Sequence, residues 1–157
     1  MTSWDDVSAA APDLAKAVQA RFEAQKHSVL ATLRRDGSPR LSGTETLFAG
    51  GRLWLGSMGG SRKSADLQRD GRCALHSMPD LEMRDGDAKI SGRAVEVVDE
   101  AGWAAYRAVH PTGGEAPGPF ELFEIDVTEI VLSRVEGDHM VIDSWHPGGA
   151  VRRVERR

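Results

Sequence analysis

The stretch SVLATLRRDGSPRLSGTETLFAGGRLWLGS, from Ser28 to Ser57, contains three apolar segments separated by tight turns. Asp36-Gly37 in the first turn and Gly50-Gly51 in the second are typical hairpin residues. Strands joined by turns this short pair antiparallel, so the stretch predicts a β-meander and not a βαβ unit. The predicted strands are His27–Leu33, about Arg40–Phe48, and Leu53–Ser57.

Further strands follow the meander along the chain. Apolar residues alternate or cluster in the segments Cys73–Met78, Asp87–Val98, Phe123–Leu132 and His139–Trp145. Within the second of these the apolar positions change phase, which predicts a bulge or bend near Gly92.

Three helices accompany the strands. Leu14, Val18 and Phe22 recur every fourth residue, so residues 12–26 predict an amphipathic N-terminal helix. Ser61 is a good N-cap for a short helix over Arg62–Arg69. A further helix is predicted from Asp99 to Val109.

About seven mostly consecutive antiparallel strands in 157 residues predict a mainly β single domain with accessory helices, arranged as a small closed barrel. No G-x-G-x-x-G motif follows a first strand, so a dinucleotide-binding parallel sheet is not expected.

Composition narrows the class of protein further. The net charge of −4 argues against a general nucleic-acid binder, and no apolar run approaches the length of a membrane span. The single cysteine, Cys73, excludes an intrachain disulfide framework and favours a cytoplasmic location. Four arginines crowd the last six residues, which predicts a short, solvated basic tail or, alternatively, a local contact with an anion or partner.

The most informative motif is GSMGGSRKS, residues 56–64. A strand ends in small and hydroxyl residues, a glycine-rich loop follows, and Arg62 and Lys63 then stand in the first turn of a helix. Free N–H groups and the positive dipole end of a helix attract anions there. The motif therefore predicts a phosphate site that is not a nucleotide P-loop; the alternative is a surface helix with solvated basic residues.

Other residue types give weaker signals. The five histidines are scattered without metal-ligand spacing, so no metal site is expected. No nucleophile-elbow motif is present, and the acidic residues fit turns and caps better than an acid–base pair. Trp145, in a polar and glycine-rich setting, is predicted to be half-exposed, where it could flank a planar ligand or close a dimer interface.

The order of these elements resembles the pyridoxamine 5′-phosphate oxidase-like, flavin-binding split-barrel superfamily. The resemblance runs from Val29 to Trp145 and includes VLATL at 29–33, DGSP at 36–39, LWLGS at 53–57, GSRK at 60–63, DLQRDGRCAL at 66–75, ISGRAVE at 90–96 and FEIDVTEI at 123–130. It implies a six-stranded antiparallel split barrel over residues 28–145 that forms a homodimer, with the cofactor at the dimer interface.

The resemblance also implies a cofactor site. Its phosphate would be held by Ser57, Arg62 and Lys63, while the backbone of the strand over Ser42–Thr46 runs along the flavin ring. The full set of expected cofactor-binding residues is Ser42, Gly43, Thr44, Ser57, Met58, Ser61, Arg62, Lys63 and Trp145.

The sequence departs from the oxidase proper at two places. Ser42-Gly43-Thr44-Glu45 lacks the expected Arg and Lys, and Met140–Trp145 stands where an Arg-Leu-His-Asp-Arg motif is expected. The expectation is therefore an oxidoreductase other than a true pyridoxamine phosphate oxidase. FMN is the expected cofactor and the deazaflavin coenzyme F-420 the alternative.

In such a protein the cofactor transfers hydride to or from a small substrate, and no catalytic residue is assigned. Two further readings remain open: a non-enzymatic flavin or haem carrier or sensor of the same fold, and a scaffold without cofactor.

Overall fold

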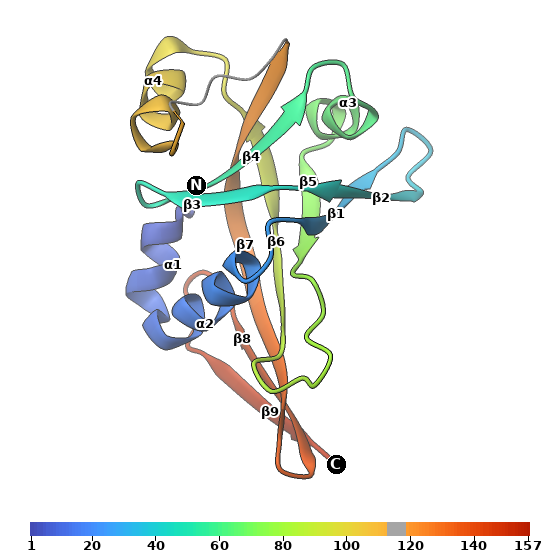
Figure 1. Ribbon diagram of the computed structural model, residues 1–157, viewed down its shortest axis with the longest axis vertical. Coiled ribbons are helices and arrows are strands. Elements are labelled where there is room, and N and C mark those ends of the chain that lie inside the picture. Colours follow the sequence, from blue (N-terminus) through green and yellow to red (C-terminus); the bar gives the residue numbers. More distant parts are fainter. Residues whose placement is uncertain (113–118) are drawn as a thin grey trace.

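The computed structural model describes residues 1–112 and 119–157, and its centre is one antiparallel sheet of nine strands. Seven strands pair in the order β2-β1-β5-β6-β7-β4-β3, and β8 and β9 continue from β7 on a separate branch. Figure 1 shows the long strands β6 and β7 running through the middle of the molecule. The strands are β1 (Ser28–Leu33), β2 (Pro39–Thr44), β3 (Thr46–Ala49), β4 (Arg52–Met58), β5 (Arg72–His76), β6 (Asp87–Glu96), β7 (Phe120–Glu136), β8 (His139–Trp145) and β9 (Arg152–Arg156).

The hydrogen-bonded sheet is not closed, so the expected closed barrel is wrong and the split barrel is confirmed. The two ends of the strand order, β2 and β3, follow each other in the chain and are separated only by Glu45. The predicted second strand divides at this residue: β2 pairs with β1, whereas β3 pairs with β4. The covalent chain therefore bridges the gap that hydrogen bonds leave open.

The ninth strand was missed because its residues look like a solvated tail. Arg152–Arg156 pairs with β8 along its length, although most of its side chains are exposed as expected. Its charged side chains form exposed ion pairs, among them that of Arg153 with Glu136 at 2.7 Å, so the strand lacks the apolar pattern by which the other strands were predicted.

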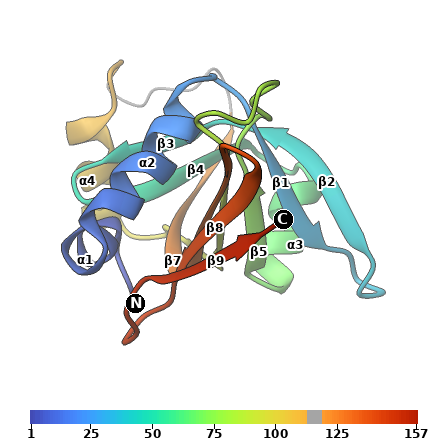
Figure 2. The same cartoon turned by 90° about the horizontal axis from the view of Figure 1, so that it is seen from below.

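Four helices of the described residues flank the sheet. They are α1 (Trp4–Ala10), α2 (Pro12–Glu23), α3 (Arg62–Arg69) and α4 (Glu100–Val109). Helices α1 and α2 lie on one flank and α3 on the other (Figure 2). The N-terminal helix ends at Glu23, three residues earlier than predicted, and α1 was not predicted because it is only seven residues long.

The main core lies between α1, α2 and the inner face of the sheet. Val7, Val18, Leu30, Phe123 and Ile130 are each fully buried in it. A smaller cluster around Trp54, Tyr106 and Leu122 packs α4 against β4 and β7. The smaller cluster holds α4 against one face of β4. The opposite face of β4 is turned toward the main core.

The irregularity predicted near Gly92 is confirmed. The register between β6 and β7 shifts between Ser91 and Gly92, and Thr128 on β7 is the extra residue. A Cβ atom at residue 92 would stand 2.4 Å from the carbonyl oxygen of Asp126, so only glycine permits this close approach of the strands.

The Cys73 thiol should react slowly in the folded protein. Burial raises its pKa to about 11, so the reactive thiolate is scarce at neutral pH. We expect alkylation by iodoacetamide to be much slower in buffer than in denaturant. Equal rates in the two conditions would contradict the burial of Cys73.

Candidate functional site

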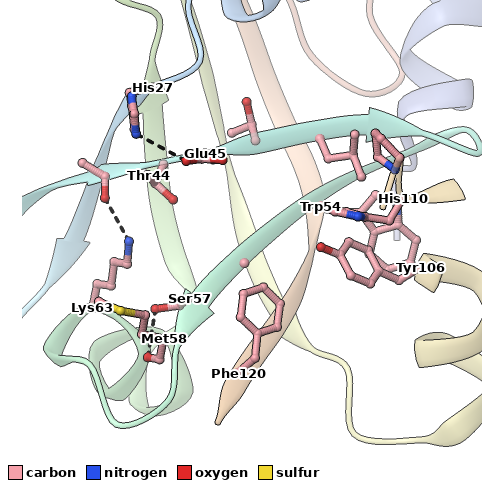
Figure 3. Close-up of a pocket in the computed structure, with 15 residues that line it drawn as sticks. His27, Thr44, Glu45, Trp54, Ser57, Met58, Lys63, Tyr106, His110 and Phe120 are labelled. Atoms are coloured by element: carbon pink, nitrogen blue, oxygen red, sulfur yellow. Dashed lines mark hydrogen bonds and ion pairs between the residues drawn. The ribbon is translucent and has the colours of Figure 1, made fainter. Parts of the chain in front are cut away.

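One hollow lies where the split in the sheet opens. It has a volume of about 550 Å³ and is bounded by the β2–β3 junction, β4, the start of α3, and α4 with the residues after it (Figure 3). This volume falls within the range typical of small-molecule and cofactor sites. The lining residues are His27, Gly43, Thr44, Glu45, Thr46, Leu47, Trp54, Gly56, Ser57, Met58, Lys63, Tyr106, His110, Pro111 and Phe120.

One end of this cavity carries a positive charge. Lys63 stands in the first turn of α3, and its Nζ donates a hydrogen bond to the carbonyl oxygen of Gly43 at 2.9 Å. Burial lowers the pKa of Lys63, although the nearby Glu45 carboxylate opposes this effect. The ammonium group is thus partly desolvated and points at the backbone of β2.

The loop before α3 is held by hydroxyl groups. The Ser61 Oγ accepts a hydrogen bond from the backbone N–H of Ser64 at 3.2 Å, which confirms Ser61 as the N-cap. The hydroxyls of Ser57 and Ser61 lie 2.8 Å apart, so the end of β4 is tied to the start of the helix. This link presents Ser57 and Lys63 on the same side of the cavity.

The hydroxyl of Thr44 is a buried polar group without a hydrogen-bond partner among the described residues. Thr44 is 3% exposed, and it closes β2 at the cavity wall. A buried hydroxyl that lacks a partner is energetically costly, and such groups call for an explanation. A bound ligand with a polar group near Lys63 would supply the missing partner.

The other end of the cavity is aromatic. Trp54 and Tyr106 pack edge to face with ring centroids 5.5 Å apart, and Phe120 lies across from them (Figure 3). Gly56 permits this arrangement because a Cβ atom there would stand 2.2 Å from the Phe120 ring. A flat, apolar group therefore fits this end, whereas an anion fits the Lys63 end.

Glu45 stands between the two ends, at the break between β2 and β3. One of its oxygens lies 3.3 Å from Lys26 Nζ and 3.3 Å from His27 Nε2. The Glu45 carboxylate also influences the pKa values of Lys63 and Tyr106. Glu45, which divides the predicted second strand, thus adds a carboxylate to a cavity rim that otherwise carries the basic side chains Lys26, His27 and Lys63.

Replacing Glu45 with Gln should lower the pKa of Tyr106. Burial is the main cause of its raised pKa, and the Glu45 carboxylate adds to it by disfavouring a second negative charge. The chain has a single tyrosine, so tyrosinate absorbance in an alkaline titration reports on Tyr106 alone. Glu100→Gln, also a charge removal beside α4, is the control that should leave the curve unchanged; an unshifted curve for Glu45→Gln would contradict the coupling.

The structure brings together most of the residues expected to bind a cofactor. Five of the nine line the cavity, namely Gly43, Thr44, Ser57, Met58 and Lys63. Ser42 precedes Gly43 on β2, and Ser61 reaches the cavity wall through its contact with Ser57.

Two expected residues lie elsewhere. Arg62 lines a separate groove between α3 and the β1–β2 hairpin. Trp145 is 2% exposed, so the expectation of a half-exposed indole is wrong. Pairing with Ile130 of β7 turns its ring into the main core, which the polar residues around it do not indicate.

The sequence alone did not identify the aromatic wall or His27, Glu45 and His110. Tyr106 and Phe120 come from α4 and β7, which are distant in sequence from the GSRK motif. Trp54 is 1% exposed and contributes both to the smaller core cluster and to the cavity wall. Only the packing of α4 against β4 reveals that these residues share a site.

The described residues lack two kinds of feature, a metal-binding cluster and a helix that could span a membrane. Neither residues 1–112 nor 119–157 contain a cluster of three or more His, Cys, Asp or Glu side chains able to hold a metal ion. Over the same residues, no helix has the length and apolar character that crossing a membrane requires.

Comparison with known proteins supports this picture. Residues 14–134 match the family model described as pyridoxamine 5′-phosphate oxidase. No curated protein matches the sequence.

Solved structures at low identity share the fold. PhzG from Burkholderia lata, solved with tetrahydrophenazine-1-carboxylic acid, is 18% identical with a TM-score of 0.64, and the match covers 96% of this chain and 91% of PhzG. A pyridoxamine 5′-phosphate oxidase-related, FMN binding protein from Nostoc punctiforme is 13% identical with a TM-score of 0.64, covering 94% and 96%. A heme binding protein from Mycobacterium smegmatis is 22% identical with a TM-score of 0.62, covering 83% of this chain and 57% of that protein.

Proposed function

The chain belongs to the pyridoxamine 5′-phosphate oxidase family, and from that premise we propose that it binds FMN in the cavity between β2, β4, α3 and α4 and acts as an oxidoreductase on a small molecule. The observation that carries the proposal is the polarity of the cavity. Lys63 and the Thr44 hydroxyl, which has no hydrogen-bond partner among the described residues, lie at one end, and Trp54 and Tyr106 lie at the other. FMN has the matching shape, with a phosphate at one end and a flat ring system at the other.

The residues fit the cofactor in charge as well as in shape. Lys63 offers the ammonium group for the phosphate, and Ser57 and Thr44 add hydroxyl donors beside it. The Gly43 carbonyl holds Lys63 in place, so part of its side-chain entropy is lost before any ligand binds. Exposed backbone between β2 and β3 then borders the ring.

When bound, FMN supplies the hydride chemistry, so the protein needs no nucleophile of its own. The chain's residues bind the phosphate, orient the ring and exclude water from one ring face by means of the aromatic wall. Tyr106 stays protonated well above neutral pH because burial raises its pKa, so it remains a hydrogen-bond donor beside the ring.

The proposal includes a homodimer. Leu41 on the edge strand β2 is 71% exposed and Met58 at the cavity rim is 77% exposed. A second copy of the chain laid over this rim would cover both side chains and complete the open side of the cavity. Sedimentation of the protein at micromolar concentration tests this part, and a monomer would contradict it.

Haem is the second candidate ligand. His27 and His110 line the same cavity, and one of the similar structures is a heme binding protein. Haem would be bound through an imidazole on its iron, whereas FMN would be bound through its phosphate by Lys63.

Titrations with FMN and with hemin distinguish the two candidate ligands. We expect the cofactor-free protein to quench FMN fluorescence with saturation at one flavin per chain, and to reduce an acceptor when the bound flavin is reduced. Hemin added to the same protein should give only the spectrum of free hemin. A sharp haem absorption band without FMN binding would overturn the proposal.

A further inference from the structure

A second hollow, of about 440 Å³, lies between α3 and the β1–β2 hairpin and is lined almost entirely by charged side chains. We call it the arginine groove; its lining residues are Arg34, Arg35, Asp36, Arg40, Arg62, Ala65, Asp66 and Arg69. Five arginines face two aspartates there, on a chain whose overall charge is −4. So large a local excess of positive charge on an acidic protein is a feature that needs an explanation.

The floor of the groove is built around a buried carboxylate. Asp66 is 3% exposed and accepts hydrogen bonds from Arg40 Nε at 2.7 Å and from Arg69 Nη2 at 3.0 Å. The Thr32 hydroxyl donates a third bond to it at 2.9 Å. Both guanidinium groups are therefore held in fixed positions.

This arrangement leaves donors aimed away from Asp66. The Arg40 side chain is 19% exposed, and its only hydrogen bond among the described residues uses Nε. Its two Nη groups keep their N–H donors, in a partly desolvated position where they interact strongly with an anion. A pre-positioned guanidinium also loses less entropy than a free one when it binds a ligand.

The rim adds exposed positive charge. Arg34 and Arg35 come from the β1–β2 turn, and Arg62 comes from the first turn of α3. The side chains of Arg35 and Arg62 form no hydrogen bond or ion pair within the described part of the chain, and Asp36 is engaged by Ser38. No acidic partner within the structure therefore neutralises these two charges.

The groove is distinct from the cofactor cavity. Arg62 and Lys63 are consecutive in sequence, yet Arg62 lines the groove and Lys63 lines the cavity. The first turn of α3 thus separates two hollows that each present a cation.

We infer that the arginine groove is a binding site for the phosphate groups of a small ligand, separate from the cofactor cavity. Guanidinium forks match phosphate oxygens in pairs, and the groove offers both fixed forks on its floor and exposed forks on its rim. A diphosphate fits better than a single phosphate because the fixed pair around Asp66 and the rim arginines can each take one phosphate group. The inference does not depend on which cofactor the cavity holds.

Calorimetry with pyrophosphate tests the inference directly. The titration is made on the protein saturated with FMN, or on the protein alone if FMN does not bind. We expect binding to the wild type and at least about tenfold weaker binding to the double variant Arg34→Met, Arg35→Met, because two charge-assisted contacts are lost. Arg152→Met removes an arginine of the distant strand β9 and should bind like the wild type.

A third variant separates this site from the cavity. Lys63→Met should bind pyrophosphate like the wild type. If Lys63→Met instead loses pyrophosphate binding while the double variant Arg34→Met, Arg35→Met retains it, the inference is overturned. Equal binding by the double variant and the control would overturn it as well, because the groove would then be only a solvated surface. Adenosine diphosphate and inorganic phosphate, titrated in parallel, identify the source: tighter binding of the nucleotide than of pyrophosphate indicates an organic diphosphate ligand.

Discussion

Replacing Lys63 with Met should weaken FMN binding by about one to two orders of magnitude. A hydrogen bond to a charged group contributes roughly 1.5–3 kcal/mol, and about 1.4 kcal/mol corresponds to a tenfold change in affinity. Met keeps the length and apolar stem of the side chain and removes only the ammonium group. The measurement is a fluorescence titration of FMN against the cofactor-free wild type and variant.

Control measurements show whether the loss of FMN affinity is specific to the Lys63 ammonium group. Arg152→Met removes one positive charge far from the cavity, so its FMN affinity should match that of the wild type. Thermal unfolding of each variant shows whether the fold is intact. Because burial lowers the pKa of Lys63, wild-type affinity should also decline with rising pH sooner than an ordinary lysine would predict, and Lys63→Met should lack this decline. A variant that binds FMN as tightly as the wild type would contradict the role of Lys63.

Replacing the buried Asp66 with Ala should destabilise the fold strongly. The side chain is 3% exposed and joins two arginines and a threonine, so its loss leaves Arg40 and the Thr32 hydroxyl without their partner. Removing one member of a buried ion pair costs about 3 kcal/mol or more. For a domain of this size we expect the unfolding midpoint to fall by roughly 10 °C.

The pH dependence identifies the cause of that loss. Burial alone would raise the pKa of Asp66, but hydrogen bonds from Arg40, Arg69 and Thr32 outweigh it and leave the pKa lowered. The carboxylate therefore stabilises the folded state above its unfolded pKa, and this contribution disappears as the pH falls through the lowered folded value. The gap between wild type and Asp66→Ala should shrink in acid. Asp13→Ala, at the exposed start of α2, should change the midpoint little, and a similarly small change for Asp66→Ala would contradict the account.

Local signals predicted the elements that local chemistry determines. The helix over Arg62–Arg69 has the predicted bounds because Ser61 caps its start with a side-chain hydrogen bond. The register irregularity at Gly92 was visible because the apolar positions change phase there. Asp99, the predicted first residue of the last helix, is the N-cap of α4, since its side chain accepts a bond from the Gly102 N–H, and the helix itself begins one residue later at Glu100.

What the sequence did not predict depends on contacts between distant segments. The division of the second strand at Glu45 arises because its two halves pair with different partners, β1 and β4. The aromatic wall requires α4 to pack on β4, and the burial of Trp145 requires β8 to pair with β7. The separation of Arg62 from Lys63 is a matter of side-chain direction on one helical turn, which residue type alone does not determine.

The central claim is that the cavity holds FMN with its phosphate at Lys63, and a thermodynamic cycle tests it most directly. FMN and riboflavin differ only in the phosphate, so their affinities for the wild type and for Lys63→Met together isolate the interaction between phosphate and ammonium. The account predicts that the wild type prefers FMN by about one to two orders of magnitude and that the variant largely loses this preference. An FMN preference of equal size in both proteins would contradict the claim, because the phosphate would then be bound elsewhere.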